Sequence, residues 1–488
     1  MNFEQYQELY DLIKELFIDL IDCVNRSKDE HKYIFSHHEF PIYRGLNKNG
    51  MPDFSESFIG EGPKDYKTLF TSIDKENHYN IEKITSYQKV MDFFVKYEQD
   101  LKSHIFFSNL DLSENIMKTM ISYLILNAFD CYMHTSASNE FDKDTFDKVL
   151  LRLYNRVFPD ELSVSICVPI LFVDFIDEII PITDNIRIRK LTDEELLSIY
   201  KVGGYSDTYE TLVVSSVLYI LELQNYSITN DPMFTRFAPD HREAYPLEIV
   251  DQWFAALRIT TNIDTGYGQV LAFPQDWGVK KANLIDIHGD KIHKFNNKFI
   301  KKAMWGKISA RLTADDLAPA IELFVFLLEN KNNSINIAIK RLNQAYLRDT
   351  EEDAIIDLMI GIEALVTEKD FGEISYKVSS RVSLVLSTLK DYPYSILETK
   401  KIIKDLYKYR SMIVHGESIK DKHKVVQIRE DVKIESIQLA IQLLQYLIMA
   451  ISKNATFLKA SAIDEYFMEH YEKLQTSISE DNIDKQND

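Results

Sequence analysis

The chain has 488 residues, of which 45% are hydrophobic and 27% charged, as in a globular protein with two or three domains. Its 76 Asp and Glu outnumber its 56 Lys and Arg, and the net charge of −20 argues against non-specific binding to duplex DNA or anionic membranes. Three scattered cysteines exclude a disulfide framework, no apolar run reaches the roughly 20 residues of a membrane span, and the acidic N-terminus lacks a signal-peptide layout, so we expect a cytoplasmic location and no membrane partner.

Residues 1–158 predict a mainly helical N-terminal region. Apolar residues recur at helical spacing in four segments, which are 3–24, 85–107, 113–133 and 142–157. Asp142 is suited to cap the last of these helices. Residues 25–80 have no clear period, and we expect irregular structure or short strands there.

Residues 159–312 predict a middle region of mixed α and β structure. Five runs are β-branched and apolar or alternate in polarity, and predict strands at 163–175, 185–191, 211–223, 267–273 and 284–288. Thr192 and Glu195 have the spacing of a capping box that begins a short helix. A second helix is expected over 246–260, with Trp253 facing inward.

From residue 313 the strand signal disappears, and residues 313–476 predict an all-α bundle. Seven segments show 3.6-residue periodicity, namely 314–328, 333–347, 351–367, 374–389, 398–414, 431–452 and 461–474. The polar tail, residues 477–488, is expected to be disordered. The predicted fold class is therefore multidomain and mainly α, with the mixed region between two helical ones.

The segment Lys404–Glu417, K-D-L-Y-K-Y-R-S-M-I-V-H-G-E, concentrates the chemically informative residues. It predicts the second half of an amphipathic helix that ends at Gly416, because glycine is the commonest residue just past a helix end. On a helical wheel with Ile402 at zero, Arg410 falls at about 80°, beside the apolar stripe. A guanidinium in that position must find an anion or several acceptors. His415 ends the same helix, where the helix dipole favours a positive charge.

Three segments of the bundle together resemble the ApeA-like domains of the HEPN superfamily. They are A-I-I-D-L-M-I-G-I-E-A-L-V-T-E at 354–368, E-I-S-Y-K-V-S-S-R-V-S-L-V-L at 373–386 and L-Y-K-Y-R-S-M-I-V-H-G at 406–416. The last contains the superfamily's R-x4–6-H signature with four intervening residues. The resemblance covers roughly residues 350–450, and its specificity comes from the order of the segments and from the motif's position at a helix end.

This resemblance implies an HEPN domain whose Arg410 and His415 are the catalytic residues of a metal-independent endoribonuclease, acting as a homodimer through that domain. The RNA 2′-OH would attack the phosphate, leaving 2′,3′-cyclic phosphate and 5′-hydroxyl ends. His415 would transfer protons and Arg410 would hold the scissile phosphate. Glu363 is the expected partner of Arg410. Ser411 follows the arginine where active members often have Asn, Asp or His.

Geometry also favours a dimer. On a straight helix the side chains of Arg410 and His415 point about 140° apart, so one phosphate cannot easily meet both from one chain. Either the helix unwinds before Gly416 or a second subunit supplies the other group.

Two segments carry a net positive charge, unlike the chain as a whole, and suggest contacts with RNA. Nine basic and two acidic residues give residues 280–311 a net charge of +7, and nine basic and five acidic residues give residues 390–424 a net charge of +4. The RNA-binding candidates are Lys408, Tyr407, Arg381, Lys301 and Lys302. Core packing of the tyrosine and a solvated face for the lysines are the alternatives.

No cofactor is expected. The run His37-His38-Glu39 and the pair His288/His293 resemble metal ligands only in residue type, without a recognised spacing. The resemblance implies a regulated, toxin-like effector of phage defence or abortive infection, in which residues 1–312 respond to a phage or host trigger. The alternative is a non-catalytic HEPN module for dimerisation or for binding RNA or protein, which Ser411 and the acidic total favour.

Overall fold

The computed structural model describes residues 2–37, 40–46, 52–108, 114–136, 138, 140–203, 217–231, 241–278, 282, 284–296, 311–368 and 374–484. The chain divides into two compact units. Unit 1 comprises Met1–Tyr245, Tyr267–His293 and Ile300–Arg311, and unit 2 comprises Pro246–Gly266, Lys294–Phe299 and Leu312–Asp488. The molecule is mainly helical, with one mixed region built on a sheet.

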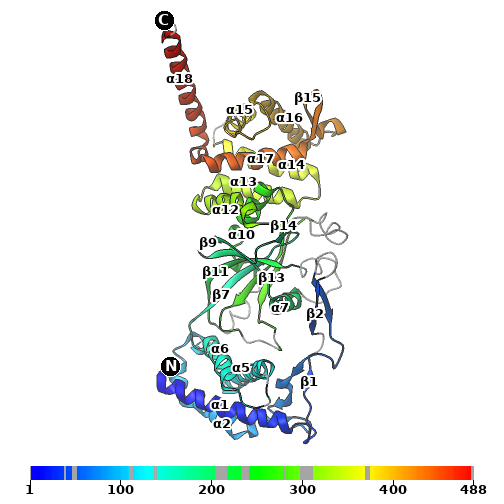
Figure 1. Cartoon of the computed structure of the whole chain (residues 1–488), viewed down its shortest axis with the longest axis vertical. Coiled ribbons are helices and arrows are strands. Elements are labelled where there is room, and N and C mark those ends of the chain that lie inside the picture. Colours follow the sequence, from blue (N-terminus) through cyan, green and yellow to red (C-terminus); the bar gives the residue numbers. More distant parts are fainter. Residues whose placement is uncertain are drawn as a thin grey trace. The chain divides into compact units, whose positions relative to one another are not determined.

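Unit 1 begins with a group of helices around an aromatic core (Figure 1). These helices are α1 (Phe3–Arg26), α2 (Thr85–Lys96), α3 (Glu98–Leu101), α4 (Ile105–Ser108), α5 (Glu114–Thr135) and α6 (Lys143–Val157). Phe17 of α1 meets the rings of Phe129 and Phe146 edge-on, at centroid distances of 5.5 and 5.3 Å. Asp142 caps α6 by accepting from the Asp144 amide, as predicted. The helix expected over 85–107 is broken into α2, α3 and α4.

Short strands fill the stretch between α1 and α2, as the lack of periodicity predicted. They are β1 (Phe35–Ser36), β2 (Pro41–Leu46), β3 (Pro52–Glu56), β4 (Lys64–Asp65), β5 (Phe70–Thr71) and β6 (Tyr79–Asn80). β1 pairs antiparallel with β4, and β2 with β3. These pairings join neighbouring parts of the chain without forming one continuous sheet.

The rest of unit 1 is organised on a six-stranded sheet of order β13-β12-β7-β11-β10-β9 within the described residues. Its strands are β7 (Glu161–Pro169), β9 (Ile179–Thr183), β10 (Ile186–Lys190), β11 (Tyr219–Thr229), β12 (Tyr267–Pro274) and β13 (His288–Lys294). The pairs β9–β10, β10–β11, β11–β7 and β7–β12 are antiparallel. Thr192 and Glu195 form the predicted capping box of α7 (Asp193–Gly203). A shorter strand pair joins β8 (Asp174–Phe175) to β14 (Arg311–Leu312).

Three predicted strand boundaries in this region are wrong. β7 ends at Pro169, and β11 begins at Tyr219 and continues to Thr229, while residues 211–216 lie outside the described residues. β13 lies at 288–294, after the apolar run that suggested a strand at 284–288. β13 is at the edge of the sheet, where solvent on one side tolerates the polar sequence H-G-D-K-I-H-K, so apolar content was a poor guide.

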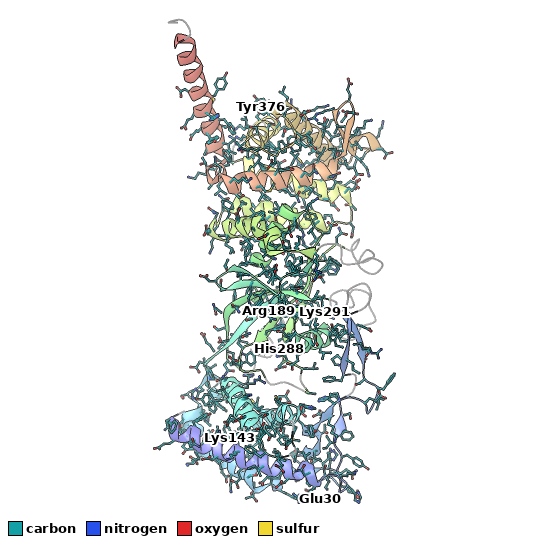
Figure 2. All side chains as sticks on the ribbon, in the orientation of Figure 1. Glu30, Lys143, Arg189, His288, Lys291 and Tyr376 are labelled. Carbon is teal, nitrogen blue, oxygen red and sulfur yellow. The ribbon has the colours of Figure 1, made fainter. Side chains whose placement is uncertain are left out.

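A buried charge network that no motif indicated lies within the sheet. Arg189 of β10, labelled in Figure 2, binds Glu195 through two nitrogens at 2.7 and 2.8 Å and Glu222 of β11 at 3.0 Å. Glu222 is 3% exposed, so it depends on Arg189 and on Arg187, 2.5 Å away, for compensation of its charge. The network links β10, β11 and the start of α7.

Unit 2 is a helical bundle with a β-hairpin. Its helices are α10 (Leu247–Thr261), α12 (Ala314–Glu329), α13 (Asn333–Leu347), α14 (Glu351–Val366), α15 (Ile374–Leu386), α16 (Ile396–Val414), α17 (Ser436–Lys453) and α18 (Ala460–Asp484). α10 belongs to this bundle although its sequence lies within the expected middle region. Trp253 of α10 is fully buried and meets Phe324 of α12 at a centroid distance of 5.4 Å.

Two predictions for this unit are wrong. The C-terminal part is not all-α, because β15 (Val425–Arg429) and β16 (Val432–Glu435) form an antiparallel hairpin, and α17 starts at Ser436 instead of 431. Burial alternates along β15, and this period of two was obscured by the strong helical pattern that follows. α18 is drawn up to Asp484 and so overlaps the tail from Ser477, whose expected disorder stays a prediction. Adding residues to an existing helix is much easier than nucleating one, so a polar sequence can prolong it.

No helix in the described parts of the chain combines the length and the apolar character needed to cross a bilayer.

Candidate active site at the end of α16

The site predicted from sequence lies at the C-terminal end of α16, whose start is well capped. Ser395 accepts from the Glu398 amide at 3.3 Å, and the Glu398 carboxylate accepts from the Ser395 amide at 2.8 Å. Four residues of the predicted apolar stripe are buried, namely Ile402, Ile403, Leu406 and Tyr409, whereas Ile413 is half-buried and Met412 is buried in addition. This face anchors α16 in the bundle and leaves the opposite face in solvent.

The end of α16 has the geometry of a Schellman motif. The Gly416 amide donates to Ile413 O at 3.1 Å, and the Glu417 amide donates to Met412 O at 2.9 Å. Gly416 has φ +67°, a left-handed conformation that L side chains rarely adopt. The predicted stop is therefore confirmed, and it fixes the backbone that carries His415.

Arg410 lies half-buried at the edge of the apolar stripe. Its Nε is buried and has no hydrogen-bond partner among the described residues. Every other arginine of unit 2 has an acceptor, namely Arg258 (Asn343 and Thr265 O), Arg341 and Arg348 (both Asp357), Arg381 (Asp464) and Arg429 (Glu398). Arg410 thus has unused donor capacity in a unit where arginines are otherwise tied to acceptors.

His415 is exposed and is the C-cap residue of α16, with φ −90° and ψ 3°. α16 remains α-helical through Val414, and the His415 amide still donates to Ser411 O at 3.0 Å. The helix therefore does not unwind between Arg410 and His415. Unwinding of the helix, one of the two arrangements that could bring both side chains to one phosphate, therefore does not occur, and the other arrangement is a second subunit.

The predicted partner of Arg410 makes a different contact. Glu363 of α14 accepts a hydrogen bond from the Tyr407 hydroxyl at 2.5 Å. Burial raises the pKa of Tyr407, the bond to Glu363 raises it further, and the positive charge of Arg410 opposes both effects. The Tyr407 hydroxyl therefore donates to Glu363 and is also affected by the positive charge of Arg410. Ser411 is half-buried beside Arg410.

The remaining RNA-binding candidates differ in their surroundings. Lys408 is exposed on α16, whereas Arg381 of α15 is 7% exposed and binds Asp464 at 2.6 Å and Val366 O at 2.8 Å. These contacts make Arg381 a link between α15, α14 and α18. Lys301 and Lys302 lie outside the described residues. An aromatic contact nearby involves Tyr376 of α15, labelled in Figure 2, whose ring lies 4.7 Å from Lys400 Nζ of α16.

A group of three potential metal ligands in unit 1 was not predicted from the sequence. His37, Asp65 and Asp130 bring one potential ligand atom each to within 4.8 Å of the others. A usable signal was present in α5, where Asp130 interrupts the apolar run L-I-L-N-A-F-D-C-Y-M, since a carboxylate in an apolar face needs a partner. The two other members could not be assigned to it without the fold.

Comparison of the chain with protein-family models, characterised proteins and solved structures finds no significant match.

Proposed function

We propose that unit 2 contains an HEPN-type domain and that Arg410 and His415 make the protein a metal-independent endoribonuclease. The observation that carries this proposal is the arginine itself. Its buried Nε has no partner among the described residues, while the other arginines of the unit are tied to acceptors. A guanidinium held at a helix end with unused donors is suited to an incoming phosphate.

The chemistry divides between the two residues. His415 takes the proton of the ribose 2′-OH as its oxygen forms a bond to phosphorus, and the P–O5′ bond breaks as the 5′-oxygen accepts a proton from a second acid. Arg410 neutralises the charge that accumulates on the phosphoryl oxygens. The products carry a 2′,3′-cyclic phosphate and a 5′-hydroxyl. Because the RNA supplies its own nucleophile, this route requires no metal ion.

A homodimer completes the site. Regular helix through Val414 keeps Arg410 and His415 about 140° apart on one chain. With a two-fold axis near the end of α16, Arg410 of one subunit and His415 of the other face the same phosphate, and the leaving 5′-oxygen takes its proton from water. Lys408, exposed on the same helix, adds positive charge for the RNA backbone.

The biological role that fits such an enzyme is a regulated effector of phage defence, with unit 1 responding to a phage or host trigger. The second candidate function is a non-catalytic HEPN module that dimerises or binds RNA or protein. Ser411 favours that alternative, because active members of the superfamily often have Asn, Asp or His at this position.

RNA cleavage in EDTA distinguishes the two functions. The wild type is compared with Arg410→Ala and His415→Ala, and with His470→Ala as a control, since His470 is an exposed histidine of α18 away from the motif. We expect the wild type and the control to cleave, leaving 2′,3′-cyclic phosphate ends, and both site variants to lose at least about 100-fold in rate. Circular dichroism in the same buffer checks folding. Equal cleavage by all four proteins would exclude this site, and RNA binding without cleavage would favour the alternative.

A further inference from the structure

A second group of chemically suited residues lies in unit 1 and takes no part in the proposed cleavage. His37 follows β1, Asp65 ends β4 and Asp130 lies on α5, so three separate segments contribute. One ligand atom from each lies within 4.8 Å of the other two. His37 Nδ1 is 3.8 Å from Asp65 Oδ2.

The backbone around this group is held closely. β1 and β4 pair with Phe35 opposite Asp65, and the His37 amide donates to Pro63 O at 2.8 Å. A Cβ at Gly62 would lie 2.0 Å from His37 O, so the chain can approach His37 this closely only with glycine there. The backbone positions of His37 and Asp65 are therefore set by main-chain contacts.

The two carboxylates are only partly satisfied. Asp130 is 1% exposed, and its Oδ1 accepts from the Tyr66 amide at 2.8 Å. Its Oδ2 and Asp65 Oδ1 are buried and have no hydrogen-bond partner among the described residues. A fully buried carboxylate with an unsatisfied oxygen is costly unless a cation compensates it.

Protein cations nearby compensate only in part. Lys67 Nζ is 3.8 Å from Asp65 Oδ1, but its hydrogen bond goes to Asn127 Oδ1 at 3.1 Å. His134 Nε2 is 2.7 Å from Lys64 O and 3.7 Å from Asp130 Oδ1. Among the described residues, one ammonium, that of Lys67, therefore lies near the two carboxylates.

We propose that His37, Asp65 and Asp130 bind one divalent transition-metal ion of the Zn²⁺ class. One imidazole with two carboxylates is a donor set suited to Zn²⁺, whereas Mg²⁺ and Ca²⁺ prefer oxygen ligands alone. Three protein ligands leave a fourth position for water or another group. The ion joins the β1–β4 pair to α5 and thereby cross-links two segments that the chain brings together only through its fold.

Zn²⁺ binding to the full-length, tag-free protein tests this site. The protein is treated with a chelator, the chelator is removed, and Zn²⁺ is titrated by calorimetry with the bound metal counted by mass spectrometry. We expect one Zn²⁺ per wild-type chain and a rise in melting temperature with added Zn²⁺. Asp130→Asn, which keeps an oxygen for the Tyr66 amide, and His37→Gln should each lose at least about tenfold in affinity.

Asp92→Asn is the matched control, because Asp92 is an exposed aspartate on α2 of the same unit and should bind Zn²⁺ as the wild type does. Failure of the wild type to bind Zn²⁺, or equal binding by all four proteins, would overturn the proposal. If Asp130→Asn fails to fold, His37→Gln alone decides, since its side chain is partly exposed. The titration contains no RNA, so its outcome is independent of whether Arg410 and His415 cleave.

Discussion

At the scale of single residues, two arginines of unit 2 differ in whether the protein itself supplies acceptors for the guanidinium group. Arg381 donates hydrogen bonds to Asp464 and to Val366 O and so links three helices. Arg410 is half-buried, and its Nε has no hydrogen-bond partner within the described residues. Stability alone does not explain a half-buried arginine with an unpaired Nε, because a buried donor without an acceptor destabilises the native state.

Replacing each arginine with methionine separates these roles, because methionine keeps the apolar stem and removes the charge. Arg381→Met should lower the free energy of unfolding by about 2–4 kcal/mol, since Asp464 and the Val366 carbonyl lose their partner. Arg410→Met should change it by less than about 1 kcal/mol, or increase it, while abolishing RNA cleavage. Urea denaturation of the two variants measures this difference. Equal losses of stability would show that Arg410 is a structural residue.

At the scale of elements, α16 is defined at both ends and tied to the hairpin beside it. The capping box of Ser395 and Glu398 starts it, and the Schellman motif at Gly416 ends it. Arg429 of β15 donates to Glu398 at 2.6 Å, and Lys401 Nζ donates to Gln427 O at 2.6 Å. Glu398 therefore serves the helix start and the hairpin together, and its charge state affects both.

Acid should weaken this junction in a defined pH range. The hydrogen bond from Arg429 and the Ser395 amide lower the pKa of Glu398 from 4.5 to about 2. A carboxylate with a lowered pKa in the folded state stabilises the protein fully above the unfolded pKa, and this contribution is lost as pH falls from about 4.5 towards 2. Glu398→Gln should reduce the loss of thermal stability across that range.

Melting curves of the wild type and of Glu398→Gln between pH 6 and pH 2.5 test this expectation, with Glu417→Gln as a control at an exposed position just past the other end of α16. A wild-type pH profile that Glu398→Gln leaves unchanged would show that the junction does not contribute to acid sensitivity.

At the scale of the whole molecule, the proposed enzyme requires two copies, because regular helix through Val414 separates the two site residues on one chain. This makes the stoichiometry testable without a structure of the complex. A site shared between subunits can be rebuilt from two differently damaged chains, whereas a site within one chain cannot.

Mixing inactive Arg410→Ala and His415→Ala chains should therefore restore activity. Half of the dimers formed at random are mixed, and each mixed dimer has one complete site and one without either residue, so we expect about a quarter of the wild-type rate. The assay is RNA cleavage after the chains are mixed and allowed to exchange subunits, with each variant alone as the baseline. No recovery despite verified exchange would place both residues in separate sites or in none.

Much of the local structure was determined by the sequence itself. The start of α6 at Asp142, the capping box of Thr192 and Glu195, and the end of α16 at Gly416 were all predictable, because caps and helical periodicity act over a few neighbouring residues. The hairpin β15–β16 was not predicted. The strong helical periodicity of α17 obscured the weaker alternation of apolar and polar residues in the strands before it.

Only the tertiary structure decided which distant residues meet. The order β13-β12-β7-β11-β10-β9, the place of α10 in the bundle and the pairing of Glu363 with Tyr407 all depend on contacts between segments far apart in the chain. The lack of a partner for the Arg410 Nε among the described residues, and the convergence of His37, Asp65 and Asp130, likewise follow from packing. Periodicity and spacing report the conformation of a segment, whereas the partners of a buried charge are set by what the whole fold places around it.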